Sequence, residues 1–230
     1  MIETILLTAT IDPGGVPIHI KDPVERLTQY AISLLCWIRE GPFDQIVLCD
    51  NSGYTNLEPL RRIAAATNRK VEIISFKGNH GSLTKGKGYG EAEIMEHAFR
   101  HSALIRSSWS IWKVTGRLYV PNAAKVQEVH HNDRHVMTSD TRYFKISQNF
   151  FWCHLHPHKE ALDDNRPEGN IESVYGHVIA AMSDHYIQVF REPIELVGQG
   201  GGSGMWYGPY PKWAVEEARQ IISSASPTGG

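Results

Sequence analysis

The apolar residues of the N-terminal half follow two alternating patterns. Short continuous apolar runs at residues 4–10, 45–49 and 70–76 predict buried strands. Between these runs, apolar residues recur at helical spacing over residues 23–40 and 57–68. The β-α-β-α-β order indicates a parallel sheet, because parallel neighbours need a crossover helix. We therefore expect an α/β fold with a mostly parallel central sheet flanked by helices.

The first predicted helix carries signals at both ends. Asp22 is a typical N-cap residue, and Pro23 suits the first helical position. Gly41 and Pro42 end the helix. The segment before it, residues 11–22, is rich in proline and glycine and predicts a loop at the end of the first strand.

Polar residues stand where the first two predicted strands end. In parallel α/β sheets, ligands bind beyond the carboxyl ends of the strands. The candidates at this edge are Thr8, Thr10, Asp50, Asn51 and Ser52. They predict one side of a binding site.

Residues 79–91 (NHGSLTKGKGYGE) precede an amphipathic helical pattern at residues 91–100. Glycine lets a backbone approach a ligand closely, and a helix start offers unpaired N–H groups. Two lysines add positive charge, so the segment predicts a phosphate site. Its candidate residues are Asn79, Lys85, Gly86, Lys87, Gly88 and Glu91. It matches neither a P-loop nor the dinucleotide fingerprint, and a solvated surface connector stays open as the alternative.

A fourth strand is predicted at residues 110–120, interrupted at Gly116. Glycine inside a strand marks a bulge or a close approach to a ligand. Strand alternation would place Lys113, Thr115 and Arg117 on one face, where the two cations could meet a ligand. Ordinary exposed side chains beside a plain bulge are the alternative.

Composition narrows the class of protein. The 230 residues carry a formal net charge of −2, which argues against a general nucleic-acid partner. Three cysteines without disulfide or metal spacing fit a reducing cytosol. No apolar run has the length of a membrane span, and no signal segment is legible at the N-terminus. We expect a cytoplasmic protein with one domain over residues 1–223 and a disordered tail at 224–230; peripheral membrane contact stays open.

Histidines crowd the segment between the two halves of the chain. In an extended strand, His154, His156 and His158 would share one face and could bind zinc. Pro157 interrupts that geometry. We therefore favour a solvated or acceptor-lining segment and expect no metal ligands.

Taken in order, these motifs resemble a GT-A-fold nucleotide-sugar-dependent glycosyltransferase of the small bacterial surface-polysaccharide type. The resemblance assigns residues 1–120 to a Rossmann-like half that binds the nucleotide sugar and 121–223 to an acceptor half. It implies that Glu172, in Gly169-Asn170-Ile171-Glu172, is the catalytic base. It also implies that the loop 198–204, with Ser203, lies near the donor phosphates.

One departure from that family concerns the metal. Its usual metal-binding Asp-x-Asp occurs nowhere in the chain, and the corresponding place reads Thr115-Gly116-Arg117. The charge of a leaving nucleotide still needs stabilisation by a cation or by fixed positive groups. We therefore expect metal-independent transfer without a cofactor. The available cations are Lys85, Lys87, Lys113 and Arg117.

The resulting hypothesis is an inverting transfer in polysaccharide biosynthesis, from a nucleotide-sugar donor to a glycan or lipid-linked acceptor. Glu172 would deprotonate the acceptor hydroxyl, with Asp140 as the rival base. Asp50 and Ser52 would hold ribose or base, and Arg117 would stabilise the leaving group. A sugar nucleotidyltransferase and a non-catalytic nucleotide- or glycan-binding module are the alternatives.

Overall fold

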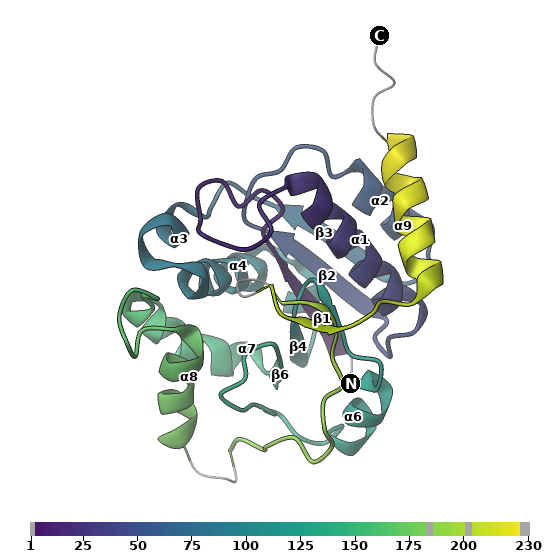
Figure 1. The fold of residues 1–230 in the computed structure, drawn as a ribbon. Helices are drawn as coiled ribbons and strands as arrows, with labels where there is room; N and C mark the ends of the chain where they lie inside the picture. Colours follow the sequence, from purple (N-terminus) through teal and green to yellow (C-terminus); the bar gives the residue numbers. More distant parts are fainter. Residues whose placement is uncertain (1–2, 183–185, 201–203, 226–230) are drawn as a thin grey trace.

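The computed structural model describes residues 3–182, 186–200 and 204–225, and a five-stranded sheet forms its centre (Figure 1). The strand order is β3-β2-β1-β4-β6. The first four pair in parallel, and β6 is antiparallel to β4. The strands are β1 (Glu3–Ala9), β2 (Gln45–Asp50), β3 (Lys70–Ser75), β4 (Ser110–Thr115) and β6 (Tyr143–Ile146). The predicted fold class, α/β with a mostly parallel sheet, is confirmed.

Helices cover both faces of this sheet because its strands are apolar on both sides. In β1, Ile5 and Leu7 enter one buried cluster, and Leu6 enters the other. On the first face pack α1 (Pro23–Arg39), α2 (Glu58–Ala65) and α9 (Lys212–Ala225). On the second pack α4 (Lys87–His101), α5 (Ala103–Arg106), α7 (Gln148–Phe150), the π-helix η1 (Phe151–Leu155) and α8 (Ile171–Ala180).

The start of α1 is as predicted. The Asp22 carboxylate accepts hydrogen bonds from the backbone N–H groups of Val24 and Glu25, and Pro23 lies in the first turn. The last helix, α9, runs to Ala225, two residues into the segment predicted as a tail. Residues 226–230 lie outside the described part of the chain.

The predicted strand 110–120 is two strands in different sheets. After β4 the chain turns at Gly116 into β5 (Leu118–Tyr119), which pairs with β7 (Val197–Gln199); β7 in turn pairs with β8 (Trp206–Gly208). Gly116 N–H donates to the Thr8 carbonyl at 2.9 Å, and a Cβ there would lie 2.5 Å from that oxygen. The glycine is therefore needed for close approach of two backbones.

The glycine-rich segment is helical rather than a loop. It forms α3 (His80–Lys85) and the first turn of α4, joined at Gly86 with a φ of 93°. The short elements that complete the fold are α6 (Ala123–Val129) and the 3₁₀ helix η2 (His156–Ala161).

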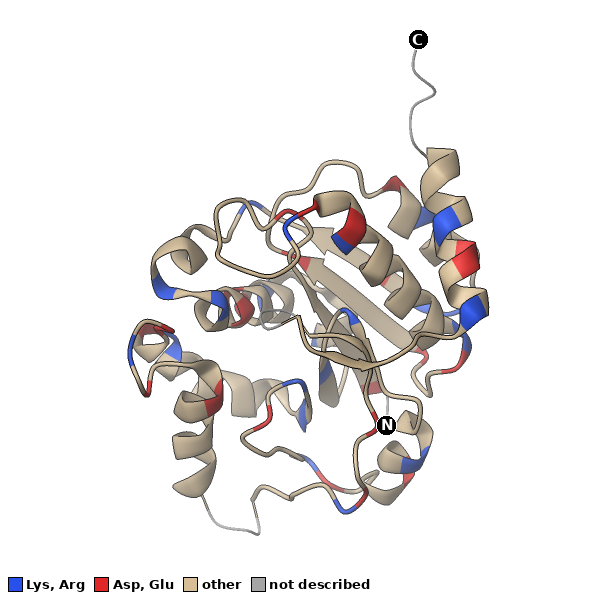
Figure 2. Ribbon diagram, in the orientation of Figure 1, with Lys and Arg blue, Asp and Glu red and all other residues tan. Residues whose placement is uncertain are grey.

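Acidic and basic residues are interspersed along the ribbon (Figure 2), in keeping with the small net charge. Within the described residues, no helix combines the length and the apolar character needed to cross a membrane.

Candidate functional site

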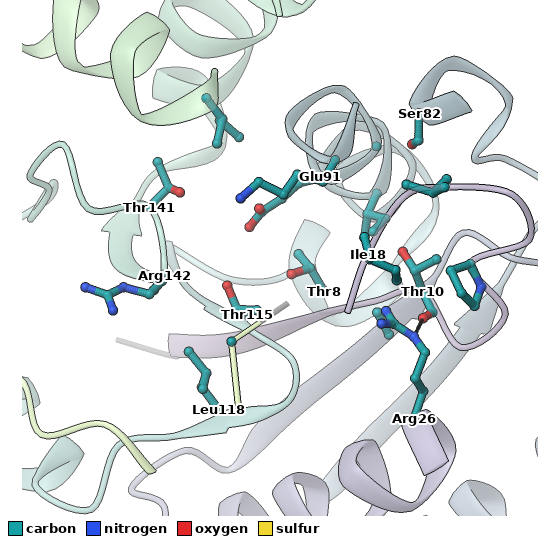
Figure 3. Close-up of a pocket in the computed structure, with 18 of the residues that line it drawn as sticks. Thr8, Thr10, Ile18, Arg26, Ser82, Glu91, Thr115, Leu118, Thr141 and Arg142 are labelled. Atoms are coloured by element: carbon teal, nitrogen blue, oxygen red, sulfur yellow. Dashed lines mark hydrogen bonds between the residues drawn. The ribbon is translucent and has the colours of Figure 1, made fainter. Parts of the chain in front are cut away.

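A cavity of about 450 Å³ opens where β1 and β4 end (Figure 3). Its walls come from the loop after β1, from α1, α3 and α4, from segment 139–142, from the first turn of α8, and from β8. Several residues predicted from the sequence meet there: Thr8, Thr10, Asn79, Lys87, Glu91, Thr115, Asp140 and Glu172. The strand ends thus place the cavity at the expected edge of the sheet.

The cavity also has lining residues that the sequence analysis missed. They include Arg26, Tyr30, Ser82, Thr141 and Arg142. A signal for Arg26 was present: Arg26, Gln29 and Ser33 recur at helical spacing, and all three are buried on α1. Polar residues repeated on the buried face of a helix indicate a site or a hydrogen-bonded anchor.

Arg26 ties the loop after β1 to α1. Its Nε donates to the Thr10 carbonyl at 2.6 Å, and its two terminal nitrogens donate to Ile20 O and Tyr30 Oη, each at 3.2 Å. Tyr30 Oη also accepts from Thr10 N at 3.0 Å. The side chain of Arg26 is buried at the cavity wall, with its residue 3% exposed.

Asp50, Asn51 and Ser52 are not in the cavity lining. The fully buried Asp50 carboxylate accepts from Ile11 N at 2.8 Å, from Ser52 Oγ at 2.8 Å and from Ser75 Oγ at 2.7 Å. Asn51 Oδ1 accepts from Thr10 Oγ1 at 2.7 Å. The three residues therefore hold the loop after β1 in place from behind.

The glycines of the 79–91 segment accommodate protein atoms. A side chain at Gly81 would collide with the Tyr89 ring, and one at Gly90 with Ser82 Oγ. At Gly86, an added Cβ would lie 2.5 Å from the Asp164 side chain.

Asp164 also occupies the start of α4. Its Oδ2 lies 3.4 Å from Gly88 N, so a carboxylate of the chain itself faces the helix start. A phosphate bound to the backbone amides at the start of α4, as predicted, would therefore have to displace the Asp164 carboxylate.

Three of the four predicted cations are engaged by the protein. Lys85 Nζ lies 2.6 Å from the Glu160 carboxylate and outside the cavity lining. Arg117, 1% exposed, donates to Gln29 Oε1 at 2.7 Å and to Gly200 O at 3.0 Å.

Lys113 is the third of these cations, and it lies beneath the cavity. Its ammonium pairs with Glu91 and donates to the Thr141 carbonyl at 2.6 Å, linking β4 to α4 and to segment 139–142. Burial lowers the pKa of Lys113, and the charges of Glu172 and Asp140 oppose that effect. Its role in the described chain is to position the residues that form the cavity floor.

Asp140 and Glu172 differ in how they are held. Arg142 Nε donates to Asp140 Oδ1 at 2.7 Å, and a second guanidinium N–H pairs with Oδ2. Burial raises the pKa of Asp140, but the hydrogen bonds and charge of Arg142 outweigh it and hold that pKa below its ordinary value. Glu172 accepts from Thr141 Oγ1 at 3.5 Å, and no cation in the described residues lies within ion-pair distance of it.

Of two neighbouring aromatic residues near the end of the chain, one lines the cavity and the other does not. Tyr207 lines the cavity, with the Arg142 guanidinium 4.8 Å from its ring centroid, whereas Trp206 is 54% exposed and outside the lining. Ser203, predicted near the donor phosphates, lies outside the described residues.

The histidines at 154–158 belong to helical segments rather than to an extended strand. His156 lies 3.3 Å from the Glu96 carboxylate. Among the described residues, no three His, Cys, Asp or Glu side chains gather as a metal site requires.

No protein-family model and no curated protein sequence matches this chain. Solved structures do resemble it. Core-mannan synthase A (CmsA/Ktr4) from Aspergillus fumigatus superimposes with a TM-score of 0.50 at 11% identity, covering 98% of this chain and 85% of that chain.

Two further structures cover nearly all of both chains. The 4-diphosphocytidyl-2C-methyl-D-erythritol synthase from Anaerococcus prevotii has a TM-score of 0.49 at 7% identity, with 96% and 98% covered. HddC from Yersinia pseudotuberculosis has a TM-score of 0.42 at 10% identity, with 97% and 99% covered. At 11% identity, the likeness to the core-mannan synthase structure shows the fold alone, and that fold is GT-A-like.

Proposed function

We propose that this protein is a glycosyltransferase that moves a sugar from a nucleotide-sugar donor to a hydroxyl of a glycan or lipid-linked acceptor. The observation that carries the proposal is the Glu172 carboxylate, which lines the cavity and makes no ion pair with any cation of the described chain. A carboxylate in that setting can accept a proton from a bound hydroxyl. Cations on the same cavity can balance an anionic donor.

Glu172 is a better base than Asp140 in this site. Arg142 occupies both oxygens of Asp140 and stabilises its charged form, which weakens it as a proton acceptor. Glu172 lies in the first turn of α8, after the N-cap Asn170 and Ile171, so the helix dipole favours its charge without blocking its oxygens. A carboxylate that serves only the dipole is the alternative that the experiment below tests.

The proposed reaction is an inverting displacement. The acceptor oxygen forms a bond to the anomeric carbon, and the bond from that carbon to the donor phosphate oxygen breaks. The acceptor proton passes to Glu172, and the nucleoside diphosphate leaves with the bonding electron pair.

We propose further that the transfer does not depend on a divalent metal. Of the carboxylates on the described cavity wall, Glu91 pairs with Lys113 and Asp140 pairs with Arg142. Glu172 is the remaining carboxylate on this wall, and the proposed reaction uses it to accept a proton, which leaves no unpaired carboxylate there to hold a metal beside the substrate phosphates. The core-mannan synthase structure is a Mn/GDP form, so the metal needs a direct test.

The test begins with calorimetric titration of a panel of nucleotide sugars, each with EDTA and with Mn²⁺. For the donor that binds, release of the nucleoside diphosphate is then followed with glycan and lipid-linked acceptors. We expect Glu172→Gln to lower kcat about 10²- to 10⁴-fold with donor affinity unchanged. Glu168→Gln is the matched control, because Glu168 is exposed and outside the cavity lining.

Full activity in Glu172→Gln would remove Glu172 as the base. Pyrophosphate release from a nucleoside triphosphate and a sugar phosphate would instead identify a nucleotidyltransferase. Donor binding that needs Mn²⁺ would overturn the metal-independent proposal.

A further inference from the structure

The cavity wall contributed by α1 carries a buried positive charge without a counter-ion. The Arg26 guanidinium donates to three neutral oxygens, and no carboxylate of the described chain lies within ion-pair distance of it. Its remaining N–H groups have no acceptor in the described chain. A buried charge without an opposite charge is destabilising unless something else supplies that charge.

The acidic side chains near Arg26 in the sequence do not pair with it, and Glu25, its direct neighbour, is exposed. Asp12 accepts from Gly14 N at 2.9 Å, and Asp22 accepts from the first backbone amides of α1. Neither carboxylate pairs with Arg26.

Two more groups on the same cavity lack partners. Lys87 is exposed at the start of α4 and has no hydrogen bond or ion pair to any described residue. The Ser82 hydroxyl is buried, its residue is 2% exposed, and its Oγ has no hydrogen-bond partner in the described chain. A buried hydroxyl without a hydrogen-bond partner destabilises the folded chain unless a ligand supplies that partner.

We infer that Arg26, Ser82 and Lys87 form an anion subsite that binds a diphosphate group. Arg26 offers a planar fork suited to phosphate oxygens, Ser82 a hydroxyl donor, and Lys87 a point charge. Lys85 and Lys113 differ from this subsite because they pair with carboxylates of the protein. Arg117, like Arg26, donates to neutral oxygens, but it does not line the cavity.

Figure 3 labels two residues of this subsite and two residues of the other wall. Arg26 and Ser82 approach the cavity from one side, and Thr141 and Arg142 from the other. Segment 139–142 also contacts Glu172 through Thr141. A donor with its diphosphate on the Arg26 side would therefore present its sugar between the subsite and Glu172. This assignment to the donor rests on the proposed function, whereas the subsite itself does not.

The test is calorimetric titration of the full chain with inorganic pyrophosphate in EDTA at fixed ionic strength. We expect Arg26→Gln to weaken pyrophosphate binding about 10- to 100-fold, the range for hydrogen bonds to a charged group. Arg26→Lys should recover only part of it, because an ammonium cannot make the forked contact. Lys87→Met, at an exposed position, should weaken binding without altering the fold.

Ser82→Ala provides a variant with opposite effects on stability and binding. Removing an unpartnered buried hydroxyl should leave the unfolding temperature equal or higher, yet weaken pyrophosphate binding about 2- to 10-fold. Lys70→Met is the matched charge control, because Lys70 is exposed at the start of β3, the opposite end of the sheet.

Competition then separates the subsite from the proposed function. Displacement of pyrophosphate by a nucleoside diphosphate, weakened by the same variants, supports both. Pyrophosphate binding that depends on Arg26 but that no nucleotide displaces retains the subsite and removes the donor assignment. Absence of pyrophosphate binding to the wild-type chain, or equal affinity in Arg26→Gln and Lys87→Met, overturns the subsite.

Discussion

Replacing Asp50 tests whether its carboxylate has a structural role or contacts a ligand. In Asp50→Ala, the buried Ile11 N–H and the Ser75 hydroxyl both lose their acceptor. At about 1–3 kcal/mol for each group left unsatisfied, the free energy of unfolding should fall by about 3 kcal/mol. Asp50→Asn keeps one oxygen for Ile11 N–H, and the serine hydroxyls can rotate toward its amide, so we expect a loss of only about 1–2 kcal/mol.

Urea unfolding followed by tryptophan fluorescence measures both losses. The control is Asp44→Asn, an exposed residue just before β2, which should stay within about 0.5 kcal/mol of wild type. Nucleotide affinity is measured alongside. If Asp50→Asn kept wild-type stability but lost nucleotide binding, Asp50 would be a ligand contact, as its place at a strand end predicts, and our structural reasoning would be refuted.

Two further predictions concern the other wall of the cavity. Lys113→Met should lower the free energy of unfolding by about 3 kcal/mol because it leaves the Glu91 carboxylate without its cation; in a double-mutant cycle, Glu91→Gln should recover part of that loss, and purely additive effects would contradict the pairing. Arg142→Met should remove the effect that lowers the pKa of Asp140. Because the folded pKa of Asp140 lies below its unfolded value of 3.8, this stabilisation is present above about pH 4 and is lost as the pH falls through the folded pKa. The stability difference between wild type and Arg142→Met should therefore be larger at pH 6 than at pH 3, and a difference independent of pH would contradict it.

The strands and the first helix could be predicted because their signals are local. Continuous apolar runs placed β1, β2 and β3 to within a residue or two, and the Asp22 and Pro23 pair fixed the start of α1. Parallel order followed from the alternation with helices. These features depend on residues next to one another in the chain.

The role of the glycine-rich segment could not be predicted from adjacent residues alone. Glycine is required equally by a ligand that approaches the backbone and by a side chain that packs on it. At Gly86 the neighbouring atoms come from Asp164, far along the chain, and at Gly81 they come from Tyr89. The sequence alone does not show whether a ligand or a protein side chain will pack against each glycine.

Whether each cation could contact a ligand was not predictable for a related reason. Lys85 pairs with Glu160, Lys113 with Glu91, and Arg117 bonds to Gln29. These partners are 22 to 88 residues away in the sequence. Whether a cation is available to a ligand depends on tertiary pairing, which residue type and spacing do not give.

Arg26 is informative because no carboxylate of the described chain pairs with it. A fold can bury an arginine beside carbonyl and hydroxyl oxygens, but these neutral acceptors offset its charge less well than a carboxylate does. A ligand that brings negative charge to this wall would both bind there and stabilise the folded chain, by about 2.7 kcal/mol at a concentration one hundred times its Kd. Binding and stability at Arg26 are therefore coupled. Replacing Arg26 should weaken the ligand's stabilising effect more than replacing Lys87, whose exposed charge water already solvates.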